Sequence, residues 1–212
     1  MKITYHIEDL PNDIKFAGSI AVDTEAMGLN VNRDRLCLVQ ISDPEQNVHL
    51  IHFKADSKYN ATNLKRIMND PTLLKIFHFA RFDVMMIQAY LKTQVRSVYC
   101  TKIASYLTRT YTNRHSLKDL CKELLGVDLS KTEQTSDWGA DILRPEQMEY
   151  ASTDVIHLHQ LKDKLDILLK RENRTEIARN CFEFLNTRAL LDILGMVDED
   201  IFAHSLGSKT RI

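Results

Sequence analysis

The chain has 212 residues, of which 44% are hydrophobic and 27% are charged, and its formal net charge is −1. This composition is typical of a soluble globular domain with a sizeable apolar core and room for a short helical annex. No apolar stretch is long enough to cross a bilayer, and residues 1–13 lack the apolar segment of a secretory signal, so we expect no membrane partner. The net charge also excludes the strong overall basic excess that is typical of proteins that bind long nucleic acids.

The cysteines indicate neither a disulfide framework nor a zinc site. They lie far apart in apolar surroundings, and none forms a CxxC pair: Cys37, Cys100, Cys121 and Cys181. Buried free thiols in a reducing compartment explain this pattern, so we expect a cytoplasmic protein.

The first third of the chain is predicted to form strands. Residues 17–24 (AGSIAVDT) are a short apolar run that ends in an acid, and strands at 35–41 and 48–53 follow it. The turn-rich segment SDPEQN separates the last two strands. Three strands at such short intervals predict an antiparallel meander.

The rest of the chain alternates helices and strands and then becomes helical. The predicted elements are a helix at 62–68, a strand at 73–79, a helix at 82–91, a strand at 95–99, helices at 102–107 and 117–125, a long helix at 146–169 with Pro145 in its first turn, and a helix at 174–194. This order predicts an α/β fold with a mixed sheet, although periodicity alone does not choose between mixed sheets.

Asp23 and Glu25 are the first candidate site residues. Strand alternation places them on one face, with Thr24 on the other. Two adjacent carboxylates repel each other unless a cation lies between them, and oxygen ligands favour Mg²⁺ or Mn²⁺. The alternative is coincidence, because about four acid-x-acid pairs are expected by chance in a chain of this composition.

Two further elements carry acids. Asp83 follows a predicted buried strand, near the start of a helix, where it could simply favour the helix N-terminus. Tyr150 and Asp154 are four residues apart on a helix and therefore project together, with His157 continuing the same side. The alternative is a tyrosine packed on a solvated helix face.

The polar segment 131–138, followed by Arg144-Pro145, contains the single tryptophan, Trp138. By itself it is a polar loop anchored to the core by that ring. Together and in chain order, however, the four elements resemble the DEDDy exonucleases and, within them, the ribonuclease D family. The resemblance runs from about residue 17 to about residue 170. It includes the segment 131–154 and the family's acid-x-acid, His-Asn-Ala-x-Phe-Asp and Tyr-x-x-x-Asp motifs, matched by Asp23, Glu25, His78, Ala80, Phe82, Asp83, Tyr150 and Asp154.

The resemblance implies a ribonuclease H-like fold, in which a mixed five-stranded sheet, made of a three-strand antiparallel meander plus parallel strands, is flanked by helices. Residues 1–170 would form the exonuclease domain. Residues 171–212 would form a C-terminal helical extension, packed on the same domain or at a subunit interface. One departure is Phe79, which stands where the family usually has asparagine.

The resemblance also implies two divalent cations, Mg²⁺ or Mn²⁺, and a catalytic role for five residues. Asp23 would bridge the two cations. Glu25 and Asp154 would complete the site that holds the attacking water. Asp83 would hold the second cation, and Tyr150 would orient the water. An unperturbed phenol with a pKa near 10 is a poor base at neutral pH.

Five further residues are candidates for substrate binding. Leu29 follows Asp23 by six residues, as does a leucine that wedges between two bases in related oligoribonucleases. We expect apolar base contacts from Leu29, Met27 and Phe82, although Leu29 could instead be a loop residue tucked into the core. Thr24 and His78 complete this set, and His78 could instead be a hydrogen-bonded core histidine.

With no room for the helical RNA-binding domain of long ribonuclease D proteins, the chain is most similar to the short, stand-alone nanoRNase C type, a diribonuclease. The net charge fits a substrate with few phosphates, unless basic residues are segregated to one face. We therefore expect a 3′→5′ exoribonuclease that degrades short single-stranded RNA, dinucleotides included, to mononucleotides. A 3′→5′ DNA exonuclease and an inert nuclease-like binding module are the alternatives. The apolar surface of the helix at 174–194 predicts a higher homo-oligomer.

Overall fold

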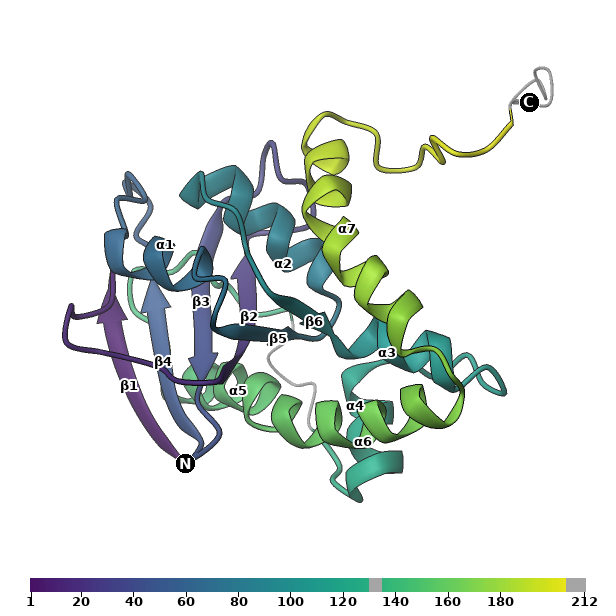
Figure 1. The fold of residues 1–212 in the computed structure, drawn as a ribbon. Coiled ribbons are helices and arrows are strands. Elements are labelled where there is room, and N and C mark those ends of the chain that lie inside the picture. Colours follow the sequence, from purple (N-terminus) through teal and green to yellow (C-terminus); the bar gives the residue numbers. More distant parts are fainter. Residues whose placement is uncertain (130–134, 205–212) are drawn as a thin grey trace.

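A computed structural model describes residues 1–129 and 135–204 of the chain. In this part, one mixed sheet has the strand order β1-β4-β3-β2-β5-β6 (Figure 1). Strands β2, β3 and β4 form the predicted antiparallel meander, and β5 and β6 run parallel to β2. The α/β fold with a mixed sheet is thus confirmed. The strands are β1 (Lys2–Ile7), β2 (Ser19–Ala26), β3 (Leu36–Ser42), β4 (Asn47–His52), β5 (Leu74–Phe77) and β6 (Val98–Cys100).

The prediction of five strands was wrong, because the described residues form a six-stranded sheet. The additional strand, β1, pairs in parallel with β4 at the edge of the sheet. Its apolar residues Ile3, Tyr5 and Ile7 alternate as in a strand, yet all three remain exposed. An edge strand that buries so little has a weak sequence signal, because strand preference mainly reflects packing against neighbours.

Helices flank the sheet. Helix α5 packs across β2, β3 and β4, whereas α2 contacts β2, and α6 and α7 pack beside β5 and β6 (Figure 1). None of the described helices combines the length and hydropathy needed to span a bilayer. The helical elements are α1 (Thr62–Met68), α2 (Ala80–Met86) continued by the π-helical turn η1 (Ile87–Leu91), α3 (Thr101–Thr108), α4 (Leu117–Leu120) continued by η2 (Cys121–Leu125), α5 (Pro145–Ile156), α6 (Leu158–Arg171) and α7 (Thr175–Ile193).

The single helix predicted at 146–169 is two helices in the structure. The break falls at His157, between α5 and α6, where the backbone has φ −95° and ψ −9°. This break lets α5 lie on the sheet while α6 turns to pack against α3 and β5. Continuous helical spacing of apolar residues could not reveal it, because each half keeps its own apolar face.

The last long helix, α7, packs against α2, α3 and β6. Near its end, Asp192 accepts two hydrogen bonds of 2.7 Å from the guanidinium of Arg81 on α2. Arg188, one turn earlier on α7, donates to the same carboxylate at 2.8 Å. This buried ion cluster attaches the C-terminal helix to the turn that begins α2, only two residues before Asp83.

Candidate active site

Three carboxylates from two elements meet at one edge of the sheet. Asp23, Glu25 and Asp154 each offer a carboxylate oxygen, and these oxygens lie within 4.8 Å of one another. Alternation along β2 points Asp23 and Glu25 to the same side, toward α5, which carries Asp154. The predicted convergence of these acids is therefore present.

Asp83 approaches the same cluster from α2. Its carboxylate is 2% exposed, and its Oδ1 accepts a hydrogen bond of 2.7 Å from the Thr24 hydroxyl. Asp83 lies outside the group of three oxygens described above. It is nevertheless the charged neighbour that most strongly raises the pKa of Asp23. The structure thus brings all four predicted acids into one electrostatic unit.

Thr24, predicted to bind substrate, has a buried side chain in the structure. Thr24 is 5% exposed, and its hydroxyl donates to Asp83. Because alternation turns Thr24 away from Asp23 and Glu25, its side chain supports the fourth acid from the other face of the sheet. Thr24 therefore orients Asp83 and has no free side-chain surface for a nucleotide.

Burial raises the pKa values of all four acids. Burial, followed by the charges of neighbouring acids, raises the pKa of Asp23 and of Glu25 well above the ordinary carboxyl range. Burial also raises the pKa of Asp83 and of Asp154 to about 7. Carboxylates in this state require a positive charge to ionise together, and hard divalent cations prefer such oxygen donors. The cluster is therefore a site for divalent cations.

Tyr150 lies beside the cluster and remains protonated at neutral pH. Burial, and then the charge of Asp154, raise its pKa far above the ordinary phenol value. Its hydroxyl also forms a hydrogen bond that partly offsets the raised pKa of Asp154. Tyr150 can therefore hold a water or a phosphate oxygen by hydrogen bonding.

The polar loop before α5 is anchored to the core by Trp138, as the sequence predicted. Trp138 is 3% exposed, and its ring centroid lies 6.2 Å from that of Tyr150. The side-chain amide of Gln147 donates to Ser136 Oγ at 2.6 Å and to the Asp137 carbonyl at 3.0 Å. These contacts fix the start of α5 and thereby the position of Tyr150. The first part of this motif, including Lys131 and Gln134, lies outside the described residues.

A cavity of about 290 Å³ contains the acidic cluster. Its wall includes Lys102 on α3 and Ser116 and Lys118 at the start of α4, none of which the sequence indicated. Isolated lysines on helices form no recognisable motif, so only the tertiary contacts identify them. The full lining is Asp23, Glu25, His78, Phe79, Lys102, Ser116, Leu117, Lys118, Leu129, Tyr150 and Asp154.

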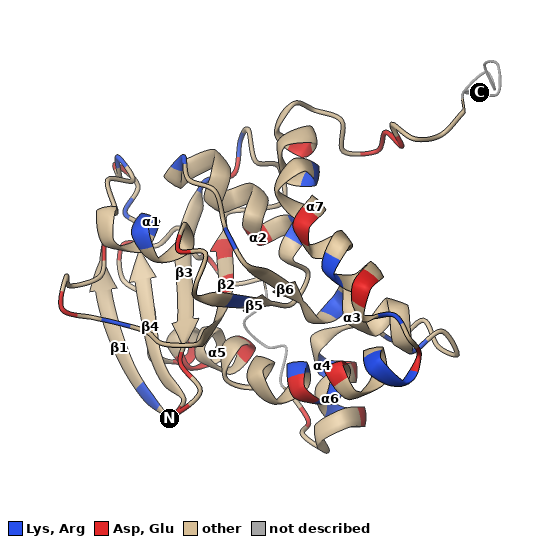
Figure 2. Cartoon of the chain, in the orientation of Figure 1, with Lys and Arg blue, Asp and Glu red and all other residues tan. Residues whose placement is uncertain are grey.

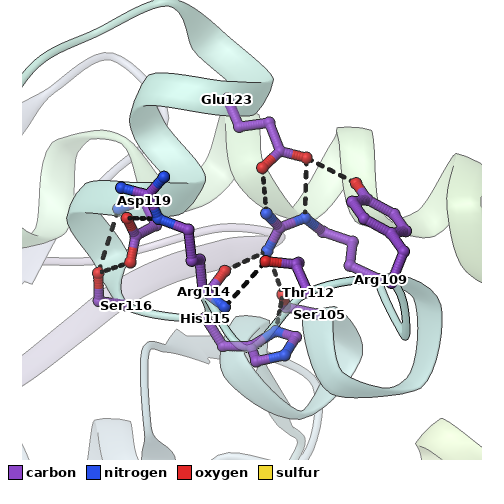
Figure 3. A network of polar contacts seen from close by, with 9 residues as sticks. Ser105, Arg109, Thr112, Arg114, His115, Ser116, Asp119 and Glu123 are labelled. Atoms are coloured by element: carbon purple, nitrogen blue, oxygen red, sulfur yellow. Dashed lines mark hydrogen bonds and ion pairs between the residues drawn. The ribbon is translucent and has the colours of Figure 1, made fainter.

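A polar network holds the backbone that carries Ser116 and Lys118 (Figure 3). The buried guanidinium of Arg109 donates to Ser105 Oγ at 2.9 Å and to the Arg114 carbonyl at 2.7 Å, and it also pairs with Glu123. Ser116 caps α4 by accepting from the Asp119 backbone N–H. The loop at 109–116 is thus tied to both α3 and η2, so this wall of the cavity has a defined shape.

Leu29 lies in the open, at the edge of a second cavity of about 630 Å³ that Phe79 and Phe82 also line. Its side chain is 83% exposed, so it is not tucked into the core. The loop that presents it is fixed by Asp34, whose carboxylate accepts from the Asn30 backbone N–H at 2.9 Å. A β-carbon at position 28 would lie 2.3 Å from Asp34 Oδ2, so this approach requires Gly28.

The other two candidates for substrate contact, Met27 and His78, differ in how exposed their side chains are. Met27 is 59% exposed, and its side chain approaches the position that a β-carbon of Gly139 would occupy. His78 has its Nδ1 within 2.9 Å of Thr101 Oγ1, and burial lowers its pKa to about 3. His78 is thus a neutral, hydrogen-bonded side chain in the wall of the catalytic cavity.

Comparisons with solved structures find chains of the same fold. Brucella melitensis NrnC with bound Mg²⁺ is 48% identical, with a TM-score of 0.91, over 97% of this chain and 100% of that chain. The same protein bound to pGG is 49% identical, with a TM-score of 0.92, over the same shares of both chains. Escherichia coli ribonuclease D shares the fold, with 24% identity and a TM-score of 0.71 over 82% of this chain and 45% of that chain.

Curated relatives and a family model give the same assignment. Ribonuclease D of Nitrobacter hamburgensis is 27% identical over 176 residues, which are 82% of this chain and 44% of that protein. DNA polymerase I of Aquifex aeolicus is 35% identical over 148 residues, which are 70% of this chain and 24% of that protein. The chain spans less than half the length of these two relatives. A family model described as 3′-5′ exonuclease matches residues 3–170, which include all four acids and Tyr150. The chain therefore belongs to the 3′-5′ exonuclease family, and its relatives place it with the ribonuclease D-like members.

Proposed function

We propose that the protein is a 3′→5′ exoribonuclease that degrades short RNA oligonucleotides, dinucleotides included, to mononucleotides with two divalent cations, Mg²⁺ or Mn²⁺. The observation that carries this proposal is the convergence of Asp23, Glu25 and Asp154 within 4.8 Å, with Asp83 and Tyr150 beside them. The relatives add support, because Brucella NrnC is described with Mg²⁺ and with pGG.

Each residue has a task in this proposal. Asp23, Glu25 and Asp154 would hold one cation, and Asp83, oriented by Thr24, would hold the other together with Asp23. Bound cations would stabilise the negative charge that develops on the phosphoryl oxygens. Tyr150 would position the attacking water through its hydroxyl, because its raised pKa keeps the phenol protonated.

The distribution of charge supports a substrate with few phosphates. Basic and acidic residues are interspersed along the described chain (Figure 2). With a net charge of −1, the protein has little long-range attraction for a long polyanion. Lys102 and Lys118 supply local positive charge within the cavity itself. This arrangement suits a short oligonucleotide that enters the cavity end first.

A DNA substrate is the second candidate, and the similarity to DNA polymerase I supports it. The preference for RNA or DNA depends on contacts with the 2′-hydroxyl.

The proposal is tested with 5′-labelled RNAs from two to about twenty nucleotides and matching DNAs, with Mg²⁺ or Mn²⁺ present. We expect 3′→5′ product ladders and the highest rate on the shortest RNAs. Higher rates on DNA would favour the second candidate, and no cleavage of any substrate with Mn²⁺ would support an inert binding module.

Three further properties belong to the proposal. We propose that residues 1–170 are the exonuclease domain and that residues 171–212 are a C-terminal helical extension, packed on the same domain or at a subunit interface. Ile177, Phe184 and Leu190 support a homo-oligomer, because they leave apolar surface of α7 exposed. Light scattering tests the oligomeric state, and a monomer at micromolar concentration would contradict the homo-oligomer.

A cytoplasmic location is supported by the four cysteines, which are all free thiols.

A further inference from the structure

Phe79 has a backbone conformation that is unfavourable for a bulky residue. It lies between β5 and α2 with φ 65° and ψ 44°, in the left-handed region. Only glycine and, less readily, asparagine or aspartate enter this region routinely. The related ribonuclease D motif usually has asparagine at this position. An aromatic residue that is kept in a strained conformation beside an active site suggests a role for its ring.

The ring of Phe79 projects into the substrate region and is not packed in the core. Its side chain is 44% exposed and contributes to the walls of three cavities. One is the catalytic cavity, and another lies beside Leu29. The third, of about 580 Å³, is a largely apolar groove between α3 and α7. Phe79 therefore lies at the boundary between the catalytic cavity and both neighbouring spaces.

Lys102 lies against this ring. Its ammonium is 4.1 Å from the ring centroid, within cation–π range. Lys102 lines both the catalytic cavity and the apolar groove. Among the described residues, its ammonium forms no ion pair with a carboxylate. The ring and the charge thus form one unit at the boundary of the two spaces, with the charge available to an incoming anion.

We propose that Phe79 and Lys102 form a nucleotide-recognition pair, in which the ring stacks on the base 5′ to the cleaved bond. The cleaved phosphate must lie at the carboxylate cluster. Only the nucleotide on its 5′ side can bring a further phosphate, so a ring in contact with a cation suits that nucleotide. Base–aromatic stacking tolerates every base, because each base has a π-face. The pair therefore determines affinity for the second nucleotide and not the chemical step. This inference rests on the proposed nuclease function.

The test is Phe79→Asn, which removes the ring and places a residue that tolerates the left-handed conformation. The substrates are a 5′-phosphorylated diribonucleotide and the same molecule with an abasic 5′ nucleotide. We expect the variant to raise KM for the intact dinucleotide about tenfold, with kcat within about twofold, as the loss of one stacking contact predicts. On the abasic substrate the variant and the wild type should have the same KM. The melting temperature should stay equal or rise, and Phe79→Tyr should restore KM.

If Phe79→Asn raised KM equally for the intact and the abasic dinucleotide, or left KM unchanged for the intact one, the proposed stacking of Phe79 on this base would be overturned. Lys102→Met provides the second variant, since it removes the charge and keeps an unbranched apolar side chain. It should raise KM several-fold more for the 5′-phosphorylated dinucleotide than for the unphosphorylated one, and equal effects on both would refute the role of the ammonium. If the wild-type protein cleaves no oligonucleotide with Mn²⁺ present, the proposed function fails. If it cleaves and the variants behave as wild type, only the present inference fails.

Discussion

Two buried clusters of charged side chains in this protein have opposite electrostatic surroundings. In the first, Asp192 is 3% exposed and lies between the guanidinium groups of Arg81 and Arg188. Burial alone would raise its pKa, but hydrogen bonds from both arginines outweigh burial and hold the pKa below its ordinary value. In the second, Asp23 has other carboxylates as its principal charged neighbours, and its pKa rises well above the ordinary value.

The difference shows which cluster is structural and which is built to bind. The Asp192 cluster is complete within the chain, and its two arginines connect α7 to the start of α2. The Asp23 cluster is complete only when positive charge arrives from outside. A buried group of like charges costs stability, and a protein keeps such a group where a ligand compensates for it. Substitutions at the two sites should therefore change stability in opposite directions.

The largest expected effect is on catalysis and follows from Asp154→Asn. Replacing one carboxylate of the cluster with a weaker amide ligand should lower turnover about a thousandfold, because metal-assisted charge stabilisation supplies several kcal/mol. The apparent affinity for Mn²⁺ should also fall. In EDTA, the variant should melt at a higher temperature than the wild type, since one repelling charge is gone. Kinetics, Mn²⁺ titration and thermal melts measure these effects. Glu149→Gln, an exposed change on the same helix, is the control and should alter none of them.

Tyr150→Phe should have the next largest effect. Loss of the hydroxyl removes a positioning contact for the attacking water and should lower kcat about a hundredfold. Mn²⁺ affinity should stay close to that of the wild type, because the four carboxylates remain. Steady-state kinetics together with a metal titration separate this result from that of Asp154→Asn. A near-wild-type rate in the variant would refute the role of Tyr150.

Asp192→Asn should destabilise the protein by about 3 kcal/mol, because it leaves two arginines without their shared carboxylate. Urea unfolding in EDTA measures the change, whose sign should be opposite to that for Asp154→Asn. If both substitutions stabilise the protein, or both destabilise it, the contrast between the two clusters fails. Glu176→Gln, an exposed change in the first turn of α7, provides the matched control and should stay within about 0.5 kcal/mol of the wild type.

A further expected effect is on the pH dependence of stability. Burial raises the pKa of Asp83 and of Asp154 to about 7 in the folded protein, whereas the unfolded values lie near 4. Between about pH 4 and pH 7 the folded state therefore binds more protons, so stability in EDTA should fall as the pH rises through this window. Saturating Mn²⁺ should flatten the slope. Thermal melts from pH 5 to pH 8 test this, and a melting temperature that rises with pH in EDTA would contradict it.

Asp192 supplies the opposite pH dependence. Its pKa is below the ordinary carboxyl value, so its contribution to stability is present above the unfolded pKa and is lost only as the pH falls through the folded one. Asp192→Asn should thus change stability uniformly between pH 5 and pH 8. The slope in EDTA should persist in this variant and weaken in Asp154→Asn.

Much of the candidate site was predictable from local sequence. Period-2 alternation placed Asp23 and Glu25 on one face, and i,i+4 spacing paired Tyr150 with Asp154. The meander and the alternating helices and strands followed from apolar periodicity. These features depend on neighbours within a few residues, so the sequence by itself determined them. The resemblance of the motifs to a known family then connected acids that lie far apart in the chain.

Other features were decided only by the tertiary structure. Thr24 supports Asp83 across 59 positions, and Arg81 reaches Asp192 across 111. Lys102 enters the cavity wall, and β1 joins the sheet through its pairing with β4. None of these contacts leaves a periodic pattern in the sequence, because each depends on which surfaces meet after the chain has folded. Local spacing sets the direction in which a side chain points, but packing between distant segments decides what it touches.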